Sequence, residues 1–472
     1  MWGLAALALC AGAAQQPAPS LRQWIERARE AEQKEDLASA AAAYREILRI
    51  KPGWGSAELN LALVLNSQKQ YASALDYFDR ALRHDASLGS AHLGRGVALF
   101  NLERFAEAAG PLGTYAKGHP DDTDVHFYLG RTFESTGDYT RAIAWLQRQL
   151  QLTPRNHEAL FHLGECGRML AGAIAQRLAT DPDAVYYFTL LTAEEPRAKE
   201  EAAAVESRIR DAIGKNPDAA EGYVALGLHQ LKSGQRKEAA ASFQEAWKRN
   251  SADCRISSTC TEERDAAAGF ASTGTAASSY DTFQRARRLA EASYRRLADG
   301  FPESPLAAQA RAHLLQQNGR LAEAGENYRR AIELSGRSVA SLVDYARFLS
   351  AQGEFERALA LLDEARKTEP SSATIRALSG EVHVMKDDPA GAIPHLEAAL
   401  AARPADAQTR SYLAQSLAKL NRVAEAVRVL EKAPEDPDGR IHYLLGSLYR
   451  RLGQQEKAEK AFEIFRSRKG AR

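Results

Sequence analysis

Histidines, cysteines and acidic residues are the side chains of this sequence that could do chemistry, so we first consider their spacing. His157 and His162 flank Glu158, an arrangement that resembles a zinc-protease helix. Two ligands on one face of a helix stand four residues apart, whereas these two histidines stand five apart. The other histidines are scattered without a recurring partner. We therefore expect no metal site, no cofactor and no catalytic residue.

Further features of the sequence exclude other classes of protein. The chain has no Gly-x-x-x-x-Gly-Lys-Ser/Thr phosphate loop and no Gly-x-Ser-x-Gly nucleophile turn. Its 62 Lys and Arg against 61 Asp and Glu give a formal charge of +1, without the basic surplus that nucleic-acid binding requires. After residue 20, no apolar run approaches the roughly 18 residues of a membrane-spanning helix. The sequence thus predicts a protein that is not an enzyme, binds no nucleic acid and has no transmembrane span.

The four cysteines leave two interpretations open. Cys254 and Cys260 lie in a Ser/Thr-rich stretch and could form a disulfide in an oxidising compartment, or remain two free thiols. Without a neighbouring histidine they fall short of the four ligands of a zinc site. Cys166 lies in an apolar helical pattern, so we expect it to be a small buried hydrophobe.

The N-terminal residues resemble a secretory signal. An apolar run from Leu4 to Ala14 ends in small residues and is followed by a polar, proline-containing stretch. We therefore read residues 1–20 as a signal peptide and leader, which predicts export to the periplasm or the cell exterior. No basic residue precedes Arg22, so an extension of the first helix in a cytoplasmic protein is the alternative. A lipid anchor at Cys10 is disfavoured because Leu9, which precedes it, is not a small residue.

A period of 34 residues organises the helices that would position any binding residue. In successive blocks, two small residues stand twelve apart, and a larger apolar residue follows four positions later. Glycine-containing turn signals lie between the two halves of many blocks, and proline often follows the second half. The small and apolar residues that mark the first and several later blocks are Ala28, Ala40, Tyr44; Ala62, Ala74, Phe78; Gly96, Ala108, Leu112; Gly130, Ala142, Leu146; Gly227, Ala239, Phe243; Ala312, Ala324, Tyr328; Ala346, Ala358, Leu362; Gly380, Ala392, Leu396.

This pattern resembles the tetratricopeptide repeat family, whose units are helix-turn-helix hairpins of 34 residues. The resemblance implies an all-α fold, a right-handed α-solenoid of about twelve tandem repeats interrupted by one loop insertion. The blocks that begin at 157 and 186 are irregular, and the helical pattern is lost over residues 254–281. We therefore expect an N-terminal array at 21–253, a Ser/Thr/Gly/Ala-rich insertion at 254–281 and a C-terminal array at 282–472. The helix that resumes near residue 281 reads as the second helix of a repeat whose first helix has degenerated.

The same resemblance implies that the first helices of the repeats line a concave groove. In blocks two to five its positions form an apolar strip rimmed by charged residues, a composition suited to a helical or extended peptide segment. The predicted groove residues are Leu59, Leu63, Asn66, Leu93, Val97, Phe100, Phe127, Arg131, Glu134, Phe161 and Arg168. Tight winding of the superhelix, or an N-terminal segment that covers these residues, is the alternative. In the C-terminal array the corresponding positions are polar: Gln309, His313, Gln316, Gln317, Arg347 and Gln415.

We expect a scaffold that binds a partner peptide or protein in this groove, without catalysis. The alternative is a structural subunit of a larger envelope, export or enzyme complex that has no groove ligand of its own. The sequence does not indicate which partner, pathway or oligomeric state applies.

Overall fold

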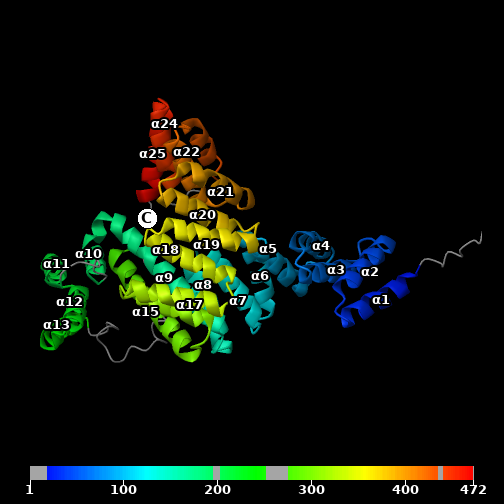
Figure 1. The fold of residues 1–472 in the computed structure, drawn as a ribbon, viewed down its shortest axis with the longest axis horizontal. Coiled ribbons are helices and arrows are strands. Elements are labelled where there is room, and N and C mark those ends of the chain that lie inside the picture. Colours follow the sequence, from blue (N-terminus) through cyan, green and yellow to red (C-terminus); the bar gives the residue numbers. More distant parts are fainter. Residues whose placement is uncertain (1–18, 195–201, 251–274, 434–438, 471–472) are drawn as a thin grey trace, which may run out of the picture. The chain divides into compact units, whose positions relative to one another are not determined.

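The computed structural model describes residues 19–194, 202–250, 275–433 and 439–470, and these form helices throughout (Figure 1). The described residues contain 24 α-helices and one short 3-10 helix, η1, and no strand. The predicted all-α solenoid is confirmed. The chain divides into two compact units, residues 1–128 and 129–472, and the boundary falls within α7 (Thr123–Ser135).

Unit 1 consists of three helical hairpins and the start of α7. Each hairpin packs its two helices against each other, and the second helix of one hairpin packs against the first helix of the next. The hairpins are α1 (Leu21–Gln33) with α2 (Leu37–Ile50), α3 (Gly55–Ser67) with α4 (Tyr71–His84), and α5 (Gly89–Asn101) with α6 (Phe105–Gly118).

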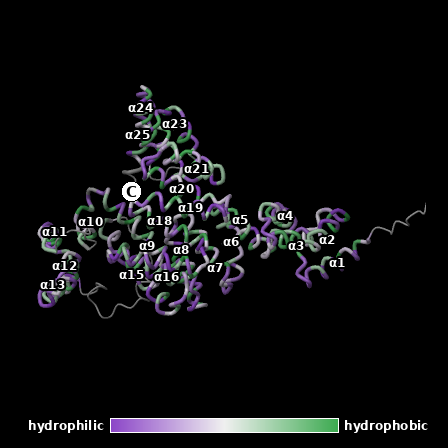
Figure 2. The backbone as a smooth tube through the Cα atoms, in the orientation of Figure 1, coloured by the Kyte–Doolittle hydropathy of each residue, from purple (hydrophilic) through white to green (hydrophobic). Residues whose placement is uncertain are grey.

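The small residues of the 34-residue pattern lie where paired helices touch. Ala62 and Ala74 are fully buried. A Cβ atom built on Gly96 would lie 2.5 Å from Leu112 Cγ, so α5 and α6 approach too closely for any side chain there. Apolar and polar stretches alternate along the helices, as Figure 2 shows. The helices therefore form mainly because each buries one face against its neighbours.

The turn inside each hairpin places one residue in the left-handed region. Glycine occupies this position in several repeats, for example Gly137 at φ 79°. In unit 1 the same turn position carries Glu35, Lys69 and Glu103 at φ 55–60°, where an L side chain is strained by about 1 kcal/mol. The turn signals of the sequence therefore fade in unit 1 although the turns themselves persist.

Unit 2 contains the rest of α7 and the helices from α8 to α25. Its main array consists of α8 (Tyr139–Leu152), α9 (His157–Thr180), α15 (Ala276–Gly300), α16 (Pro305–Gln317), α17 (Leu321–Leu334), α18 (Val339–Ala351), α19 (Phe355–Thr368), α20 (Ala373–Met385), α21 (Pro389–Ala402), α22 (Ala407–Lys419), α23 (Val423–Glu431), α24 (Arg440–Arg451) and α25 (Gln455–Gly470). Consecutive helices of this series pack against one another.

The pairing of α9 with α15 differs from the expected order of the repeats. The two helices pack along most of their length, and a Cβ atom on Gly167 would lie 2.7 Å from the backbone oxygen of Ala286. At their ends, Arg177 donates a hydrogen bond to the hydroxyl of Ser279. The expected degenerate first helix is therefore a wrong prediction. The first helix of this repeat is α9, and its partner follows about a hundred residues later.

A small lobe lies between these two partners in the sequence. It contains η1 (Pro182–Ala184), α10 (Val185–Glu194), α11 (Ala202–Lys215), α12 (Ala220–Lys232) and α13 (Arg236–Arg249). Of the helices in the lobe, α10 also packs against α9 and α15, which lie outside it. The expected insertion at 254–281 lies largely outside the described residues, so the expected domain boundaries stay predictions.

Candidate partner-binding surfaces

The predicted groove residues fall into two groups, one in each unit of the structure. The first lies in unit 1 on α3, α5 and the start of α7. The fifth residues of successive blocks are Leu59, Leu93 and Phe127, and each is half-buried. The ninth residues of the first two of these blocks are Leu63, which is 38% exposed, and Val97, which is half-buried. We call these five residues and Phe100 the apolar ladder.

The helices that carry the ladder are anchored by buried residues that lie between the ladder residues in the sequence. Leu61, Ala62 and Leu65 of α3 are fully buried in the core of unit 1, so α3 turns its other face outward. Phe100 of α5 makes edge-to-face contacts with Phe105 and Tyr128, with ring centroids 5.3 and 5.4 Å apart. The ladder thus consists of apolar side chains at equivalent positions of helices whose other faces are buried.

Asn66 stands beside Leu63 and supplies the one amide among the predicted groove residues of unit 1. Its Oδ1 is enclosed, and among the described residues no donor reaches it. An enclosed acceptor without a donor costs free energy. Because this oxygen is enclosed, a partner on the ladder does not reach it without a local rearrangement.

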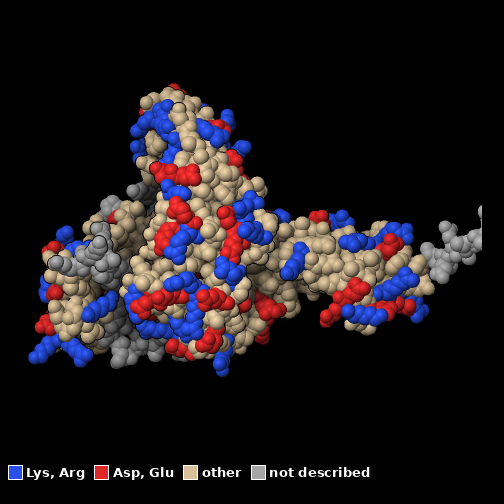
Figure 3. All heavy atoms as spheres, in the orientation of Figure 1, with Lys and Arg blue, Asp and Glu red and all other residues tan. Residues whose placement is uncertain are grey.

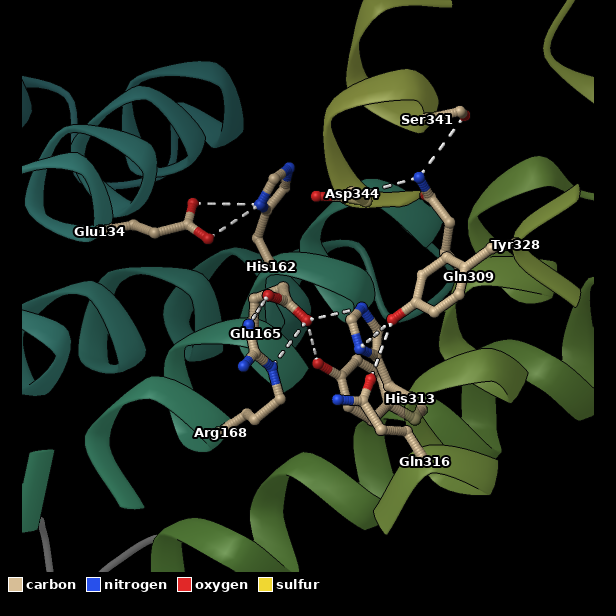
Figure 4. A network of polar contacts seen from close by, with 11 residues as sticks. Glu134, His162, Glu165, Arg168, Gln309, His313, Gln316, Tyr328, Ser341 and Asp344 are labelled. Carbon is tan, nitrogen blue, oxygen red and sulfur yellow. Dashed lines mark hydrogen bonds and ion pairs between the residues drawn. The ribbon is translucent and has the colours of Figure 1, made fainter. Parts of the chain in front are cut away.

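Of the predicted groove residues in unit 2, Arg131, Glu134 and Arg168 make polar contacts with neighbouring side chains, and Figure 4 shows those of Glu134 and Arg168 from close by. Arg131 Nε donates to Glu134 Oε2 over 3.0 Å, and His162 Nδ1 lies 3.0 Å from the same oxygen. Arg168 Nη2 donates to Glu165 Oε2 over 2.6 Å. These charges therefore pair with one another.

Phe161 differs from the expected groove residues because it lies in the core. It is 5% exposed, and its ring centroid lies 6.3 Å from that of Tyr294 and 6.2 Å from that of His313. Both neighbours come from α15 and α16, which the sequence order separates from α9. A buried ring cannot contact a partner unless these helices move apart.

Glu165 is the centre of the unit 2 network. Besides Arg168, it accepts a hydrogen bond from the hydroxyl of Tyr294, and its Oε1 lies 3.1 Å from His313 Nε2. The His313 contact has the distance of an ion pair but not the direction of a full hydrogen bond. Three groups from α9, α15 and α16 thus meet at one carboxylate, and we call these four residues the Glu165 cluster.

Burial and charge set the protonation states in this cluster. Burial alone would raise the pKa of Glu165, but Arg168, His313 and Tyr294 together hold it well below its usual range. Burial lowers the pKa of His313 to about 4, so the ring is neutral at pH 7. The Tyr328 hydroxyl lies 2.9 Å from His313 Nδ1. A tautomer with the proton on Nε2 fits both neighbours, because Nδ1 then accepts from Tyr328.

A second carboxyl borders the cluster on α18. Gln309 Nε2 donates to Asp344 Oδ2 over 3.0 Å and reaches Ser341 Oγ at 3.4 Å. Burial, with Glu165 adding to it, raises the pKa of Asp344 to about 7. Gln309 and His313 were polar groove positions in the sequence, and both are buried here. No sequence pattern indicated that Tyr294 and Asp344 belong to this network, because α15 and α18 are distant from α9 along the chain.

The sequence also made predictions about the cysteines, a metal site and a transmembrane span. Cys254 and Cys260 lie outside the described residues, so their disulfide stays a prediction. Cys166 is a free thiol that is fully buried, as expected, and burial raises its pKa well above the ordinary value. No group of three His, Cys, Asp or Glu residues suited to a metal ion occurs in the part of the chain that the structure describes. Among the same residues, no helix is both long and apolar enough to cross a membrane.

Comparisons with known families match this architecture. Models described as tetratricopeptide repeat match residues 25–88, 59–117 and 93–157, then 315–381, 384–448 and 439–463. The chain belongs to the tetratricopeptide repeat family. No curated protein matches the chain.

Several solved structures of repeat proteins are similar to the chain in fold. "MamA 41-end from Desulfovibrio magneticus RS-1" is 12% identical, with 49% of this chain and 96% of that chain covered and a TM-score of 0.27. "YrrB: a TPR protein with an unusual peptide-binding site" is 19% identical, with 46% and 97% covered and a TM-score of 0.25. The "APC/C hetero-tetramer Cut9-Hcn1" is 13% identical, with 94% and 86% covered and a TM-score of 0.32. At these values the likeness concerns the fold alone.

Proposed function

We propose that this tetratricopeptide repeat protein is a non-enzymatic scaffold that binds an apolar peptide segment of a partner protein on the apolar ladder. The family fold is a protein-interaction scaffold, and the ladder is the feature that singles out one surface of it. Leu59, Leu93 and Phe127 recur at the same position of three successive repeats, each half-buried, with Leu63 more exposed. Partly exposed apolar side chains that recur at equivalent positions of neighbouring repeats are typical of a protein-binding surface.

The size of the ladder fits a short segment. Neighbouring packed helices lie about 8–10 Å apart, so three first helices support a surface about 20 Å long. An extended peptide covers that length with about six residues, and an amphipathic helix with about four turns. Hydrophobic burial would supply most of the affinity.

The surface charge of the protein would orient the partner and adds no strong attraction of its own. On the face drawn in Figure 3, basic and acidic side chains lie interspersed over unit 2. Many are paired locally, such as Arg337 with Glu364 at 2.5 Å and Lys386 with Glu356 at 3.0 Å. Exposed pairs of this kind contribute about 0–1 kcal/mol each.

The experiment is a selection of peptides from a random library on the full chain, followed by fluorescence anisotropy with the selected peptide. The variant Leu63→Glu with Phe127→Glu places two charges on the ladder, and we expect it to weaken binding by more than tenfold. Leu420→Glu is the matched control, because Leu420 is 40% exposed and lies in unit 2. Equal binding by the ladder variant and the control would refute the ladder as the binding surface.

The second candidate function is a structural subunit of a larger complex whose assembly does not involve the ladder. Under this alternative, the ladder variant would still co-purify with the same complex as the unaltered chain. Affinity purification from the source cells, with both variants compared by quantitative mass spectrometry, separates the two functions.

We also propose that the protein is exported, on the sequence pattern of residues 1–20 alone. The mass of the intact protein from fractionated cells, measured without reductant, tests this proposal. Loss of the first 13 or so residues supports export, and a mass lower by two hydrogens indicates the bridge between Cys254 and Cys260. An intact N-terminus would contradict export, and an added lipid mass would indicate an anchor at Cys10.

A further inference from the structure

One backbone carbonyl recurs at the junction between repeats, and side chains donate to it. It belongs to the residue that stands six positions before the fourth residue of each 34-residue block. In three repeats that fourth residue itself reaches the carbonyl oxygen: His92 Nε2 lies 2.9 Å from Ala86 O, Arg376 Nη2 donates to Pro370 O over 2.7 Å, and Arg410 donates to Pro404 O.

In other repeats an arginine from elsewhere takes the same role. Where the fourth residue cannot donate well, a guanidinium group still reaches the carbonyl. The pairs are Arg249 with Pro217 O at 2.8 Å, Arg311 with Pro302 O at 3.1 Å, and Arg296 with Pro154 O at 3.4 Å. A cationic or imidazole donor at this carbonyl is therefore a recurring feature of the array.

Not every repeat follows this pattern: among the described residues no side chain donates to Gly336 O, before the repeat that begins at Val339, and the second repeat departs from the pattern further. Its fourth residue is Glu58, and the corresponding carbonyl is that of Pro52, so two acceptors stand where other repeats pair a donor with an acceptor. Among the residues that the structure describes, no side chain donates to Pro52 O. Glu58 is 5% exposed, and its Oε2 is enclosed and accepts no hydrogen bond. His84 Nε2 lies beside it, at the ion-pair distance of 3.4 Å from Oε2.

A cavity of about 140 Å³ lies at this position. Pro52, Gly53 and Glu58 line it together with Leu48 and Tyr77, and Arg45 and Arg80 complete the lining. Both arginines are exposed, and the guanidinium carbon of Arg80 lies 5.0 Å from the centroid of the Tyr77 ring. The cavity thus combines a buried carboxylate, an apolar wall and two exposed cations.

We propose that this cavity binds a basic amino acid, either free or as the C-terminal residue of a peptide. The cationic end of the ligand pairs with Glu58 and donates to Pro52 O, which is the role that Arg376 and Arg410 play in their own repeats. Its alkyl stem lies against Leu48 and Tyr77.

The charged residues that line the cavity favour a ligand that also carries a carboxylate. Arg45 and Arg80 carry two positive charges against the single negative charge of Glu58, so a simple cation would be repelled by the excess. A ligand with a carboxylate at its other end meets both arginines, which bind carboxylates well. The cavity uses other side chains than the apolar ladder, so this proposal stands or falls independently of the proposed function.

The test is isothermal titration calorimetry of the full chain with four probes. L-arginine carries both charged ends, and agmatine lacks the carboxylate. A short peptide that ends in arginine is used with a free and with an amidated C-terminus. We expect L-arginine, the free-ended peptide or both to bind, and agmatine and the amidated peptide to bind at least tenfold more weakly. The comparison of L-arginine with the free-ended peptide distinguishes the two sources of the ligand.

Two substitutions and a control test the roles of the residues. In Glu58→Gln the carboxamide can itself donate to Pro52 O, so we expect binding to fall at least tenfold while circular dichroism is unchanged. Arg80→Ala should weaken binding of L-arginine and leave agmatine unaffected. Glu46→Gln, an exposed residue of α2 outside the cavity, should bind as the unaltered chain does. No heat for any probe at millimolar concentrations, or equal heats for Glu58→Gln and the unaltered chain, would overturn the proposal and leave a cavity that holds only water.

Discussion

Replacing Arg168 with methionine tests whether the Glu165 cluster holds α9, α15 and α16 together. The substitution keeps the aliphatic bulk and removes the cation that pairs with Glu165 over 2.6 Å. Breaking a fully buried ion pair costs about 3–5 kcal/mol, and an exposed pair about 0–1 kcal/mol. The side chain of Glu165 is 15% exposed and that of Arg168 is 37% exposed. We therefore expect a loss of about 2–3 kcal/mol of stability at neutral pH, between these limits.

The pH dependence of that loss follows from the pKa of Glu165. In the unaltered protein this pKa is depressed, so the cluster contributes stability above the unfolded pKa of about 4.3 and loses it as the pH falls further. Without Arg168, burial dominates and raises the pKa of Glu165 above its unfolded value. The variant then takes up a proton on folding, so its deficit shrinks as the pH falls from about 7.5 to about 5.

Urea unfolding followed by circular dichroism at the two pH values measures the deficit. Hydrogen exchange of the α9 and α15 amides then shows whether the loss is local to the cluster. Adding Glu165→Gln to Arg168→Met removes the unpaired carboxylate and should recover part of the stability. Arg366→Met, in an exposed pair with Asp363, is the control, with an expected loss below about 1 kcal/mol. A deficit that is equal at both pH values, or no larger than that of the control, would refute the assigned role of Arg168.

Three further predictions concern the architecture. Lys69→Gly should raise the stability of unit 1 by about 1 kcal/mol, because φ at Lys69 is 60° and glycine adopts this angle without strain; a lower urea midpoint would contradict this. Gly167→Ala should cost about 3 kcal/mol and speed hydrogen exchange in α9 and α15, since its Cβ would lie 2.7 Å from Ala286 O; unchanged exchange would mean that the two helices do not pack as described. Replacing residues 182–274 with a short Gly/Ser linker should leave the rest of the array folded, because Arg177 and Ser279 already meet at the ends of α9 and α15; loss of cooperative thermal unfolding would show that the lobe is required for the fold.

The 34-residue period of the sequence predicted most of the fold and part of the candidate site. It placed Leu59, Leu93 and Phe127 at equivalent positions because the core repeats with the helices, and the structure shows all three half-buried on first helices. The period also indicated that Cys166 would be buried, and it is.

The rest depends on contacts between parts of the chain that no local pattern connects. Phe161 has the spacing of a groove residue, but Tyr294 and His313 cover it because α15 and α16 pack against α9. Tyr294 lies 129 residues after Glu165 in the sequence, and only the three-dimensional structure brings its hydroxyl to that carboxylate. Periodicity reports which side of a helix is buried and does not report which distant helix buries it.

Site-specific photocrosslinking in the source cells tests the central claim, that the apolar ladder captures a partner protein. A photoreactive amino acid is placed at Leu63 on the ladder or at Leu420 away from it, which are 38% and 40% exposed. We predict a discrete crosslinked protein at position 63 that is absent at position 420 and that disappears when Phe127→Glu is added. The same crosslinks at both positions, or a product at position 63 that persists in Phe127→Glu, would contradict the claim.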